Sequence, residues 1–539
     1  MKHDFTRIFI IILILSPVLW VSLLPASAQS PDGKWSDFVN ISNTPTASTF
    51  PCVAADIAGN IHALWSEDVG GKTKNLLFNH DGSPQLTSQG NQINYLTDTG
   101  NTLYYSRWNG QTWLEPVDIQ INPFGKIQYP EAIVDAHGVL HVVWASTQGS
   151  DTKLFYSSAF AGQAESARAW SRPVELADPI LFALYPVDIS VDVKGGLHVL
   201  YSKLGLNPGA YIINSFDGGN TWSTPIQLYI TSDENGVQEG VSNIRLVADK
   251  KGRLHATWTR YDVSGNGRAI FYSQSRDQGK SWTEPFEVAT WQPGWYEVDW
   301  LNVGIVEDEI HLVWEGSSPV AAQVERISHD GGLIWGESNF FLPNIVGENG
   351  FADLVTDSDN QLHLLVVKRG DAASLSNGIW YTTWEEGHWQ DPILLGTTDN
   401  SLYATAGDLD PQTLQDSLRG TFTGGGLRYQ KSAIVNGNEL FTIVVNEWDG
   451  DIWSSHTTLS APMISPHPFP PPTSTPTLMP TPTSTPEFQE TTQTTALPQL
   501  GGLPSSTNDP TNLVLLGALP AILVIVGFLT FVRIFKHNH

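Results

Sequence analysis

The sequence predicts an all-β protein, a seven-bladed β-propeller, and the prediction rests first on two repeated marks. A Leu/Ile-His pair recurs at intervals of 79, 57, 57, 56 and 52 residues, at His62, His141, His198, His255, His311 and His363. A tryptophan follows each of these histidines, at Trp113, Trp170, Trp222, Trp282, Trp335 and Trp389. The residues between these marks form short apolar runs bounded by Gly, Asp, Asn and Pro, a pattern typical of four short strands per repeat. Four-stranded units repeated radially are propeller blades.

The two ends of the repeat region indicate the number of blades. Lys34–Ser42 has the pattern of an outer strand with no blade in front of it. Asn438–Val445 and Asp451–Ser455 have the pattern of strands with no closing strand after them. Joining these segments gives a seventh blade and removes the exposed sheet edges that invite aggregation. A six-bladed ring is the alternative, if Leu402–Leu459 is irregular.

The first segment of the chain predicts secretion. Residues 1–28 have the pattern of a signal peptide: Lys2 and Arg7 precede the apolar run Ile8–Leu24, and Ala26-Ser27-Ala28 offers a cleavage site of small residues. A retained membrane anchor is the alternative. The propeller is then expected over residues 29–460.

The end of the chain predicts a tether. Residues 461–511 are rich in Pro, Thr and Ser, so we expect a disordered, extended linker whose hydroxyls are available for O-linked sugar. Residues 512–532 then form a transmembrane helix, because Leu513–Val532 carries no charge over about one bilayer thickness. Arg533 and Lys536 place the tail, 533–539, in the cytoplasm and the propeller outside the cell.

The stretch Leu497-Pro498-Gln499-Leu500-Gly501, followed by the apolar span and a basic tail, resembles the cell-wall sorting signals of bacterial surface proteins. Those signals need Thr where Leu500 stands, so processing by a sortase-like enzyme is the alternative to a membrane anchor. In either case the sequence indicates a bacterial surface protein.

Composition limits the partners. The formal net charge is −27 and the isoelectric point is near 4.8, which excludes nucleic acid as a partner because phosphate binding requires a basic surface. Cys52 is the only cysteine, so no intramolecular disulfide forms and Cys52 is expected to be a buried apolar residue. We expect a monomer without a cofactor. Asp357-Ser358-Asp359 opens like a calcium loop but lacks the glutamate at the twelfth position, so no metal site is predicted.

Three segments carry a family resemblance: Ser215–Trp222, Ser275–Trp282 and Ser328–Trp335. They resemble Asp-boxes, with the pattern S-x-D-x-G-x-[T/S]-W, and Ser106–Trp113 keeps the pattern except for Trp108 in place of the Asp. Asp-boxes are the repeats of the sialidase-like β-propellers, and the resemblance extends from about Trp35 to Leu459. It implies the propeller fold, because Asp-boxes occur both in enzymes and in propellers that only bind.

The repeated acids and histidines are interpreted as structural. A carboxylate that accepts backbone N–H groups, with Gly at a positive φ, makes a tight turn. This role is expected for the acids of the boxes and of the D-x-x-G turns: Asp217, Asp277, Asp330, Asp56, Asp135, Asp192, Asp249 and Asp357. Six histidines in identical mid-strand positions indicate a structural hydrogen bond in each blade rather than six metal ligands.

The working face is expected at the opposite end of the channel, where the loops into each first strand converge. Aromatic faces stack on sugar rings, and carboxylates and guanidinium groups bind polar ligand groups. The expected binding residues are Trp295, Tyr296, Trp300, Tyr129, Tyr185, Arg245, Arg260 and Arg369. If the protein is an enzyme, the candidate catalytic carboxylates are Glu297 and Asp299, together with Glu67 or Glu315. Packing between blades is the alternative role for Trp295 and Trp300.

Two functions of different class therefore stand. The first is a membrane-anchored extracellular propeller that binds a glycan, a wall polymer or a protein partner. The second is a surface glycoside hydrolase of sialidase-like type, a chemistry that needs three arginines, a Tyr nucleophile with a Glu partner and an Asp acid. The Arg-Ile-Pro motif of sialidases is absent and seven blades depart from their six, which favours the binding protein.

Overall fold

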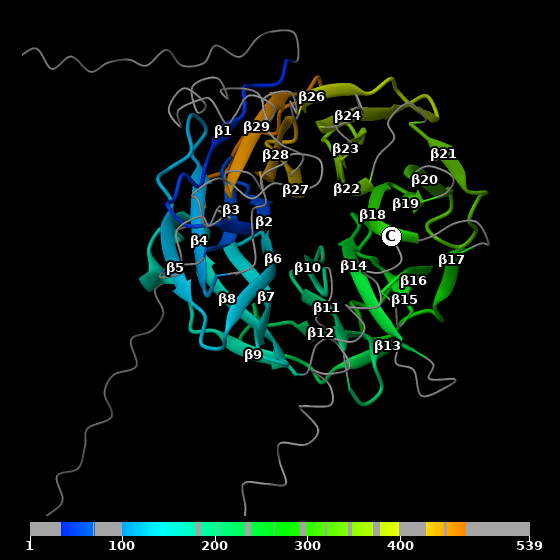
Figure 1. Ribbon diagram of the computed structural model, residues 1–539, viewed down its shortest axis with the longest axis horizontal. Coiled ribbons are helices and arrows are strands. Elements are labelled where there is room, and N and C mark those ends of the chain that lie inside the picture. Colours follow the sequence, from blue (N-terminus) through cyan, green and yellow to red (C-terminus); the bar gives the residue numbers. More distant parts are fainter. Residues whose placement is uncertain are drawn as a thin grey trace, which may run out of the picture. The chain divides into compact units, whose positions relative to one another are not determined.

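The computed structural model contains seven antiparallel sheets arranged as a ring (Figure 1). It describes residues 34–67, 69, 100–178, 185–203, 205–231, 239–262, 265–291, 298–317, 321–342, 348–369, 378–397, 427–446 and 450–469. The all-β seven-bladed propeller predicted from the repeats is thereby confirmed, and the six-bladed alternative is wrong.

Each sheet is one blade, and its strands follow the chain from the centre of the ring outward. Blade 1 consists of β2 (Ser48–Ala55), β3 (Ile61–Glu67), β4 (Thr102–Trp108) and β5 (Val117–Ile121). Blade 2 consists of β6 (Lys126–Val134), β7 (Val139–Gln148), β8 (Asp151–Phe160) and β9 (Val174–Ala177), with the 3-10 turns η1 (Ala161–Gln163) and η2 (Ala167–Ala169) before β9. Blade 3 consists of β10 (Val187–Val191), β11 (Leu197–Lys203), β12 (Gly209–Ser215) and β13 (Ile226–Ile230).

The remaining blades repeat this order. Blade 4 consists of β14 (Gly240–Ala248), β15 (Leu254–Tyr261), β16 (Gly267–Ser275) and β17 (Phe286–Thr290). Blade 5 consists of β18 (Val298–Val306), β19 (Glu309–Ser317), β20 (Ala321–Ser328) and β21 (Asn339–Phe341). Blade 6 consists of β22 (Glu348–Thr356), β23 (Leu362–Arg369), β24 (Gly378–Glu385), β25 (His388–Trp389) and β26 (Ile393–Thr397).

Blade 7 closes the ring with strands from both ends of the chain. It consists of β27 (Leu427–Val435), β28 (Glu439–Asn446), β29 (Asp451–Thr458) and the N-terminal β1 (Val39–Asn40), with β1 antiparallel to β29. Asn40 Nδ2 donates to Asp451 Oδ2 at 2.9 Å, and the Ile41 amide donates to the Ile452 carbonyl at 2.8 Å. The predicted closure is confirmed, because the termini supply the outer and inner parts of one sheet.

Burial explains the residue types of the strands. The second strands, such as β7, are buried on both faces because each blade is covered by a neighbour on either side. Their sequences therefore run Leu-His-Val-Val-Trp without polar alternation. The outer strands β5 and β13 alternate exposed and buried residues, since one of their faces meets solvent.

The repeated histidines hold the turns between the first and second strands. In blade 1 the Asp56 Oδ1 atom accepts the backbone N–H groups of Ala58 and Asn60 at 2.9 and 2.8 Å. His62 Nε2 lies 2.9 Å from Asp56 Oδ2, and His62 Nδ1 lies 2.8 Å from the Tyr105 hydroxyl. Burial by itself would raise the pKa of Asp56, but the hydrogen bonds from His62 and Asn60 lower it below its usual value. The predicted structural role of the histidine is thus seen in blade 1.

The other blades repeat this arrangement with small changes. His198, His255 and His363 lie 3.1 to 3.2 Å from the turn carboxylates Asp192, Asp249 and Asp357, and His311 lies 2.8 Å from Glu309. Blade 7 has Phe441 at this position, stacked on His456. Six blades therefore have an acid–imidazole pair at the turn end, with the two atoms 3.5 Å apart in blade 2.

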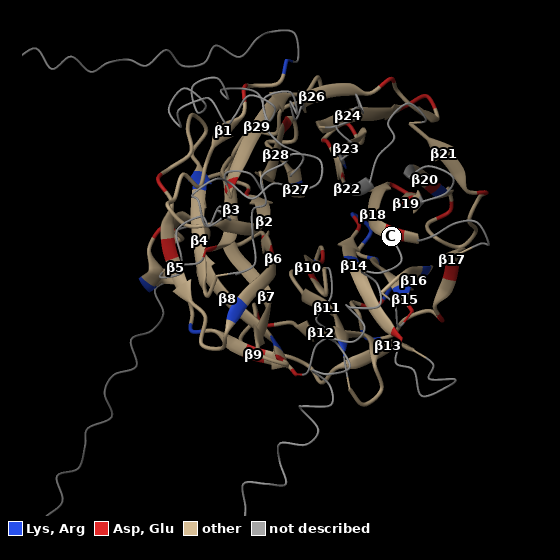
Figure 2. Ribbon diagram, in the orientation of Figure 1, with Lys and Arg blue, Asp and Glu red and all other residues tan. Residues whose placement is uncertain are grey.

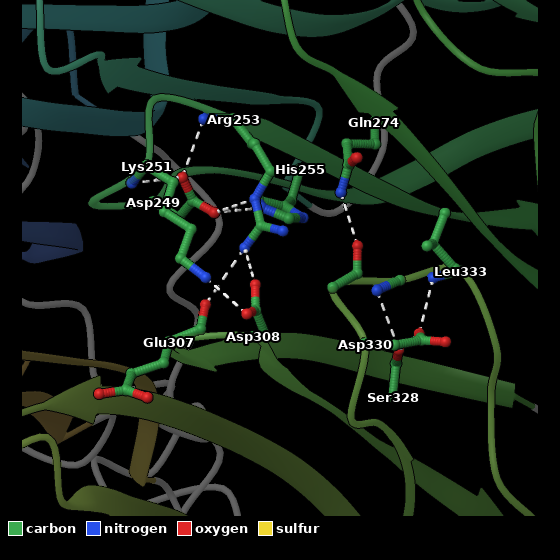
Figure 3. A network of polar contacts seen from close by, with 12 residues as sticks. Asp249, Lys251, Arg253, His255, Gln274, Glu307, Asp308, Ser328, Asp330 and Leu333 are labelled. Atoms are coloured by element: carbon green, nitrogen blue, oxygen red, sulfur yellow. Dashed lines mark hydrogen bonds and ion pairs between the residues drawn. The ribbon is translucent and has the colours of Figure 1, made fainter.

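The three Ser-x-Asp turns connect each blade to its predecessor. In blade 5 the Ser328 hydroxyl donates to Asp330 Oδ1 at 2.9 Å and accepts the Gly332 amide at 2.8 Å, while Asp330 Oδ1 also accepts the Leu333 amide at 3.0 Å (Figure 3). Gln274 of blade 4 donates to the Gly331 carbonyl at 2.7 Å, so the turn is bound from the neighbouring sheet. On the same end Arg253 bonds Asp249 of its own blade and lies 3.0 Å from Asp308 of blade 5 (Figure 3).

The predicted signal peptide, most of the predicted linker and the predicted membrane span lie outside the described residues. No helix within the described ranges is long and apolar enough to span a bilayer. Residues 461–469, which the composition assigns to the linker, lie against the propeller, with the Ile464 amide donating to the Asn436 carbonyl at 2.7 Å.

Candidate functional site

The innermost strands share an irregularity at one end of the channel. Pairing is interrupted near the start of each of six first strands, after Thr49, Gln128, Ser242, Asp299, Glu348 and Arg428. A residue with φ between 46° and 53° lies at the third or fourth position of five first strands and two residues before β10: Phe50, Tyr129, Asn243, Trp300 and Tyr429 in the strands, and Tyr185 before β10. Positive φ is uncommon outside glycine, and bulges re-aim the side chains that they carry. These six residues define the mouth, which lies at the end of the channel opposite the acid–imidazole turns.

Four of these side chains close the channel. The ring centroid of Phe50 lies 4.4 Å from that of Tyr129 and 4.7 Å from that of Tyr429, and Tyr129 lies 5.3 Å from Tyr185. These rings come from blades 1, 2, 3 and 7; Phe50, Tyr129 and Tyr185 are buried, and Tyr429 is partly buried. Burial raises the pKa of both Tyr129 and Tyr185 well above the usual value, so they stay protonated. Tyr129 and Tyr185, which the sequence predicts as ligand contacts, therefore form an aromatic plug that is the floor of the mouth.

A layer of polar side chains lies directly below the plug, one from each blade at the same register. Its members are Cys52, Glu131, Asp188, Arg245, Asn302, Asp353 and Lys431. Both signs of charge are present on the strands nearest the centre of the ring (Figure 2). Each of these residues precedes the repeated His, or Phe441 in blade 7, by ten positions, or by nine in blade 5. The residues of this layer can therefore be found in the sequence from their constant offset to the repeated histidine.

The charges of the layer compensate one another across blades. Lys431 Nζ donates to Glu131 Oε1 at 2.5 Å and lies 4.9 Å from the centre of the Tyr185 ring, while the Arg245 guanidinium lies 4.7 Å from the same ring. Burial, with a further contribution from the charge of Glu131, raises the pKa of Asp188 to about 7. Arg245, predicted as a ligand contact, is thus engaged with the plug.

The space between the plug and this layer is small. A cavity lies beside Tyr185, Asn243, Trp300 and Lys431, and its free volume is on the scale of a single water molecule. A sugar ring does not fit there. A larger ligand that enters the channel from the mouth therefore stays above the plug, on the rim of the mouth.

Among the described residues, the candidate catalytic carboxylates Asp299, Glu315 and Glu67 lie at the rim, and each is held by donors. Asp299 accepts hydrogen bonds from the Asn243 amide, the Tyr261 hydroxyl and, at 2.8 Å, the Trp300 backbone N–H. Asp299 and Glu315 are register partners on β18 and β19, so the predicted pair is adjacent in the sheet. Asn243 and Tyr261 were missed by sequence reasoning, because they come from blade 4 and no local pattern links them to Asp299.

Glu315 forms a buried ion pair with a lysine of the next blade. Lys368 Nζ lies 3.4 Å from Glu315 Oε2, and the Lys368 side chain is fully buried. Burial lowers the pKa of Lys368, although the charge of Glu315 acts in the opposite direction. This pair ties blade 5 to blade 6 at the rim.

Glu67 has a structural environment at the end of β3. Its carboxylate accepts hydrogen bonds from Thr44 at 2.6 Å, Ser48 at 2.7 Å and the Trp65 indole at 2.9 Å. Its side chain is completely buried, so it holds the segment that joins β1 to blade 1.

The last predicted residues differ in what is described of them. Arg260 Nη1 lies 3.5 Å from Glu239 Oε2, and both side chains are partly exposed. Trp295, Tyr296 and Glu297 lie outside the described residues, and of Arg369 only the backbone, at the end of β23, is described. Among the described residues no cluster of His, Cys, Asp or Glu has the composition of a metal site.

Comparisons with known proteins add the following. No protein-family model matches this chain, and no curated protein sequence matches it. Solved structures with a similar arrangement include a protein of unknown function from Dyadobacter fermentans, with a TM-score of 0.45 and 16% identity over 80% of this chain and 100% of that chain. An ulvan lyase of polysaccharide lyase family PL25 has a TM-score of 0.47 and 9% identity, over 77% of this chain and 95% of that chain.

An α-L-arabinofuranosidase from Fusarium graminearum has a TM-score of 0.40 and 11% identity, over 63% of this chain and 94% of that chain. At these identities and scores the similarities concern the fold, and the function of this chain has to be argued from its own residues.

Proposed function

We propose that this protein is an extracellular β-propeller, held at the cell membrane by one C-terminal helix, that binds a glycan, a wall polymer or a protein partner at the rim of the mouth. We further propose that it descends from the sialidase-like Asp-box propellers. The hydrogen bonds within the Ser-x-Asp turns at Asp217, Asp277 and Asp330 support that descent, because each carboxylate organises the same kind of turn.

One observation carries the choice of a binding protein over a hydrolase. The described carboxylates of the rim are held by donors from neighbouring strands: Glu67 by hydroxyls and an indole, Asp299 by an amide and a phenol, and Glu315 by Lys368. A general acid or a nucleophile has to reach its substrate, whereas a binding rim benefits from fixed groups. The closed aromatic floor also makes the mouth shallow, which suits a surface that packs on sugar faces.

A glycoside hydrolase is the second candidate, and the position of Asp299 beside Glu315 favours it. Paired residues on adjacent antiparallel strands have Cα atoms roughly 4.5–5.5 Å apart, and the carboxylates of retaining glycosidases lie about 5 Å apart. A sialidase mechanism has less support. Arg245 lies over Tyr185 and Arg260 faces Glu239, so these two guanidinium groups do not converge on one carboxylate.

The test uses the purified full-length protein on a glycan and wall-polymer array and on a panel of aryl glycosides. Trp300 lies partly buried at the mouth, whereas Trp291 follows β17 on the outer side of blade 4 and packs over Arg268. We expect Trp300→Ala to weaken array binding at least tenfold and Trp291→Ala to leave it unchanged. Turnover of a glycoside that disappears in Asp299→Asn would instead establish the hydrolase.

Membrane attachment is tested separately. The protein should remain in the membrane fraction after alkaline carbonate extraction, and a chain that ends at residue 511 should be released to the medium. Release of the full-length protein by carbonate would contradict the anchor.

A further inference from the structure

The ring is held closed by a short strand. β1 pairs with β29 through only two residue pairs, Val39 with Ser454 and Asn40 with Trp453. The covalent chain is continuous from β1 through all seven blades to β29, so the ring is closed by non-covalent contacts, in the β1–β29 pair and in the packing of blade 7 against blade 1. Hydrogen bonds of Ser36 and Ser42 extend this contact on both sides. The closure is nevertheless shorter than the ladders inside blades 1 to 4, whose outer strands have four or five residues.

After β29 the chain continues along the turn end of the ring. The Leu459 amide donates to the Asn438 carbonyl at 2.7 Å, and the Ser358 hydroxyl donates to the Pro462 carbonyl at 2.6 Å. The Ile464 amide then donates to the Asn436 carbonyl, and the His467 amide donates to the Ile57 carbonyl, both at 2.7 Å. These partners lie in the turns of blades 6, 7 and 1.

The segment ends with an aromatic contact on blade 2. The Phe469 ring lies 5.1 Å from the ring of Phe160 in an edge-on arrangement and packs against the core cluster of blades 1 and 2. Residues 459–469 therefore connect the last two blades to the first two at the turn end of the ring.

Turn glycines provide the space for this segment. A β-carbon at Gly59 would lie 3.1 Å from Pro466, one at Gly437 would lie 3.0 Å from Ile464, and one at Gly138 would lie 3.0 Å from Cγ of Phe469 and closer to the ring edge. The corresponding Gly195 of blade 3, which the segment does not reach, has no atom within 4 Å of such a β-carbon. The glycines of the crossed turns thus fit the segment, whereas the turn of blade 3 is open.

We propose that residues 459–469 are a latch that locks the propeller ring by binding the turns of blades 6, 7, 1 and 2 across the β1–β29 closure. The latch gives the ring a further non-covalent closure at the turn end, in addition to β1 and the packing of blade 7 against blade 1. Opening of the ring then requires all of these contacts to separate. A force on the chain beyond Phe469 acts on the latch before it acts on β29.

Hydrogen exchange of the full-length protein tests the latch with matched variants. Gly138 and Gly195 have similar positive φ values, 77° and 84°, so an alanine at either position has the same backbone strain, but only Gly138→Ala displaces Phe469. We expect Gly138→Ala and Phe469→Ala to speed exchange of the β1 and β29 amides about tenfold or more, with the β15 and β16 amides of blade 4 unchanged. Gly195→Ala should leave the β29 amides at the wild-type rate.

Three outcomes would overturn the latch: unchanged exchange at β1 and β29 in both latch variants, an equal increase in every blade, or an equal increase at β29 in Gly195→Ala. The proposal does not depend on what the mouth binds, so a negative glycan array leaves it standing.

The consequence for a tethered protein rests on the proposed membrane anchor and has its own readout. Single molecules are pulled between a cysteine handle at Lys280→Cys, which is exposed on blade 4, and the C-terminus, with Cys52→Ser in every chain. Gly138→Ala should lower the force of the first rupture, and Gly195→Ala should not. Equal rupture forces in the two variants would show that force on the C-terminus does not act through the latch, even if the membrane anchor is real.

Discussion

Gly218 and Gly219 of the blade 3 Ser-x-Asp turn separate backbone strain from contact between blades. Both residues have positive φ, 71° and 87°. A β-carbon at Gly218 would meet no atom within 4 Å, whereas one at Gly219 would lie 2.5 Å from Cζ of Tyr156 in blade 2 and closer still to its hydroxyl. The Tyr156 hydroxyl is fixed, because it lies 2.7 Å from Nδ1 of the buried His141.

The expected costs follow from these two terms. An alanine in the left-handed region costs about 1–2 kcal/mol, and forcing an extra methyl into a packed contact costs about 1–3 kcal/mol more. We therefore expect Gly218→Ala to lower the free energy of unfolding by about 1–2 kcal/mol and Gly219→Ala by about 2–5 kcal/mol.

Urea denaturation followed by tryptophan fluorescence measures both values, because Trp222 of this turn packs edge-on against Tyr156 with ring centroids 5.0 Å apart. Equal losses in the free energy of unfolding would show that Gly219 is not required for the close contact between blades 2 and 3. A smaller loss for Gly219→Ala in a Tyr156→Phe background would identify the hydroxyl as the clashing group.

Three further predictions concern the channel, the rim and the turn end. The raised pKa of Asp188, about 7, means that the folded protein keeps a proton that the unfolded chain releases near pH 4. The free energy of unfolding should therefore fall as pH rises from about 4 to 7, by at most about 1.4 kcal/mol per pH unit. Asp188→Asn should remove most of this slope in urea titrations, and an unchanged slope would show that another group is responsible for it. Lys368→Met leaves Glu315 buried without its lysine, so we expect a loss of about 3 kcal/mol or more in the free energy of unfolding, and a smaller loss when Glu315→Gln is added; additive losses in the double variant would contradict the pairing. Because the repeated histidines are bonded to carboxylates, phenols or amides, dialysis against EDTA should leave the melting temperature unchanged, and a drop of several degrees would point to a bound metal.

The repeats predicted the fold because five of the seven blades use the same turn. A carboxylate that takes two backbone amides and one imidazole requires Asp and His six residues apart, as at Asp56 and His62, and identical residues are visible to a search for periodicity. The closure was predictable for a related reason, since unpaired strands at both ends of a repeat array have to pair with each other.

The site was less accessible from the sequence, because the blades share its geometry and differ in residue type. Positions ten residues before the histidines hold Glu131, Asp188 and Arg245 in successive blades, so the residue type changes from blade to blade although the register is constant. Partners of the rim acids come from other blades: Asn243 donates to Asp299 from 56 positions away. The latch shows the same limit, because its composition is that of a linker while the amide of His467 bonds to Ile57, far earlier in the sequence.

Ring closure by β1 gives the propeller one mouth and one turn end. A cross-link between β1 and β29 tests this closure directly. Paired Cα atoms on antiparallel strands lie within the range that a disulfide spans, so Val39→Cys and Ser454→Cys, which replace register partners, should oxidise to an intramolecular disulfide in a Cys52→Ser chain. Thr457→Cys in place of Ser454→Cys lies three residues further along β29, roughly 10 Å away, and should stay reduced under the same conditions. If β1 pairs with β29, the first pair of cysteines should cross-link quantitatively, and the product should run as a compact monomer on non-reducing gels. Failure of that pair to cross-link, or equal cross-linking of both pairs, would contradict this closure.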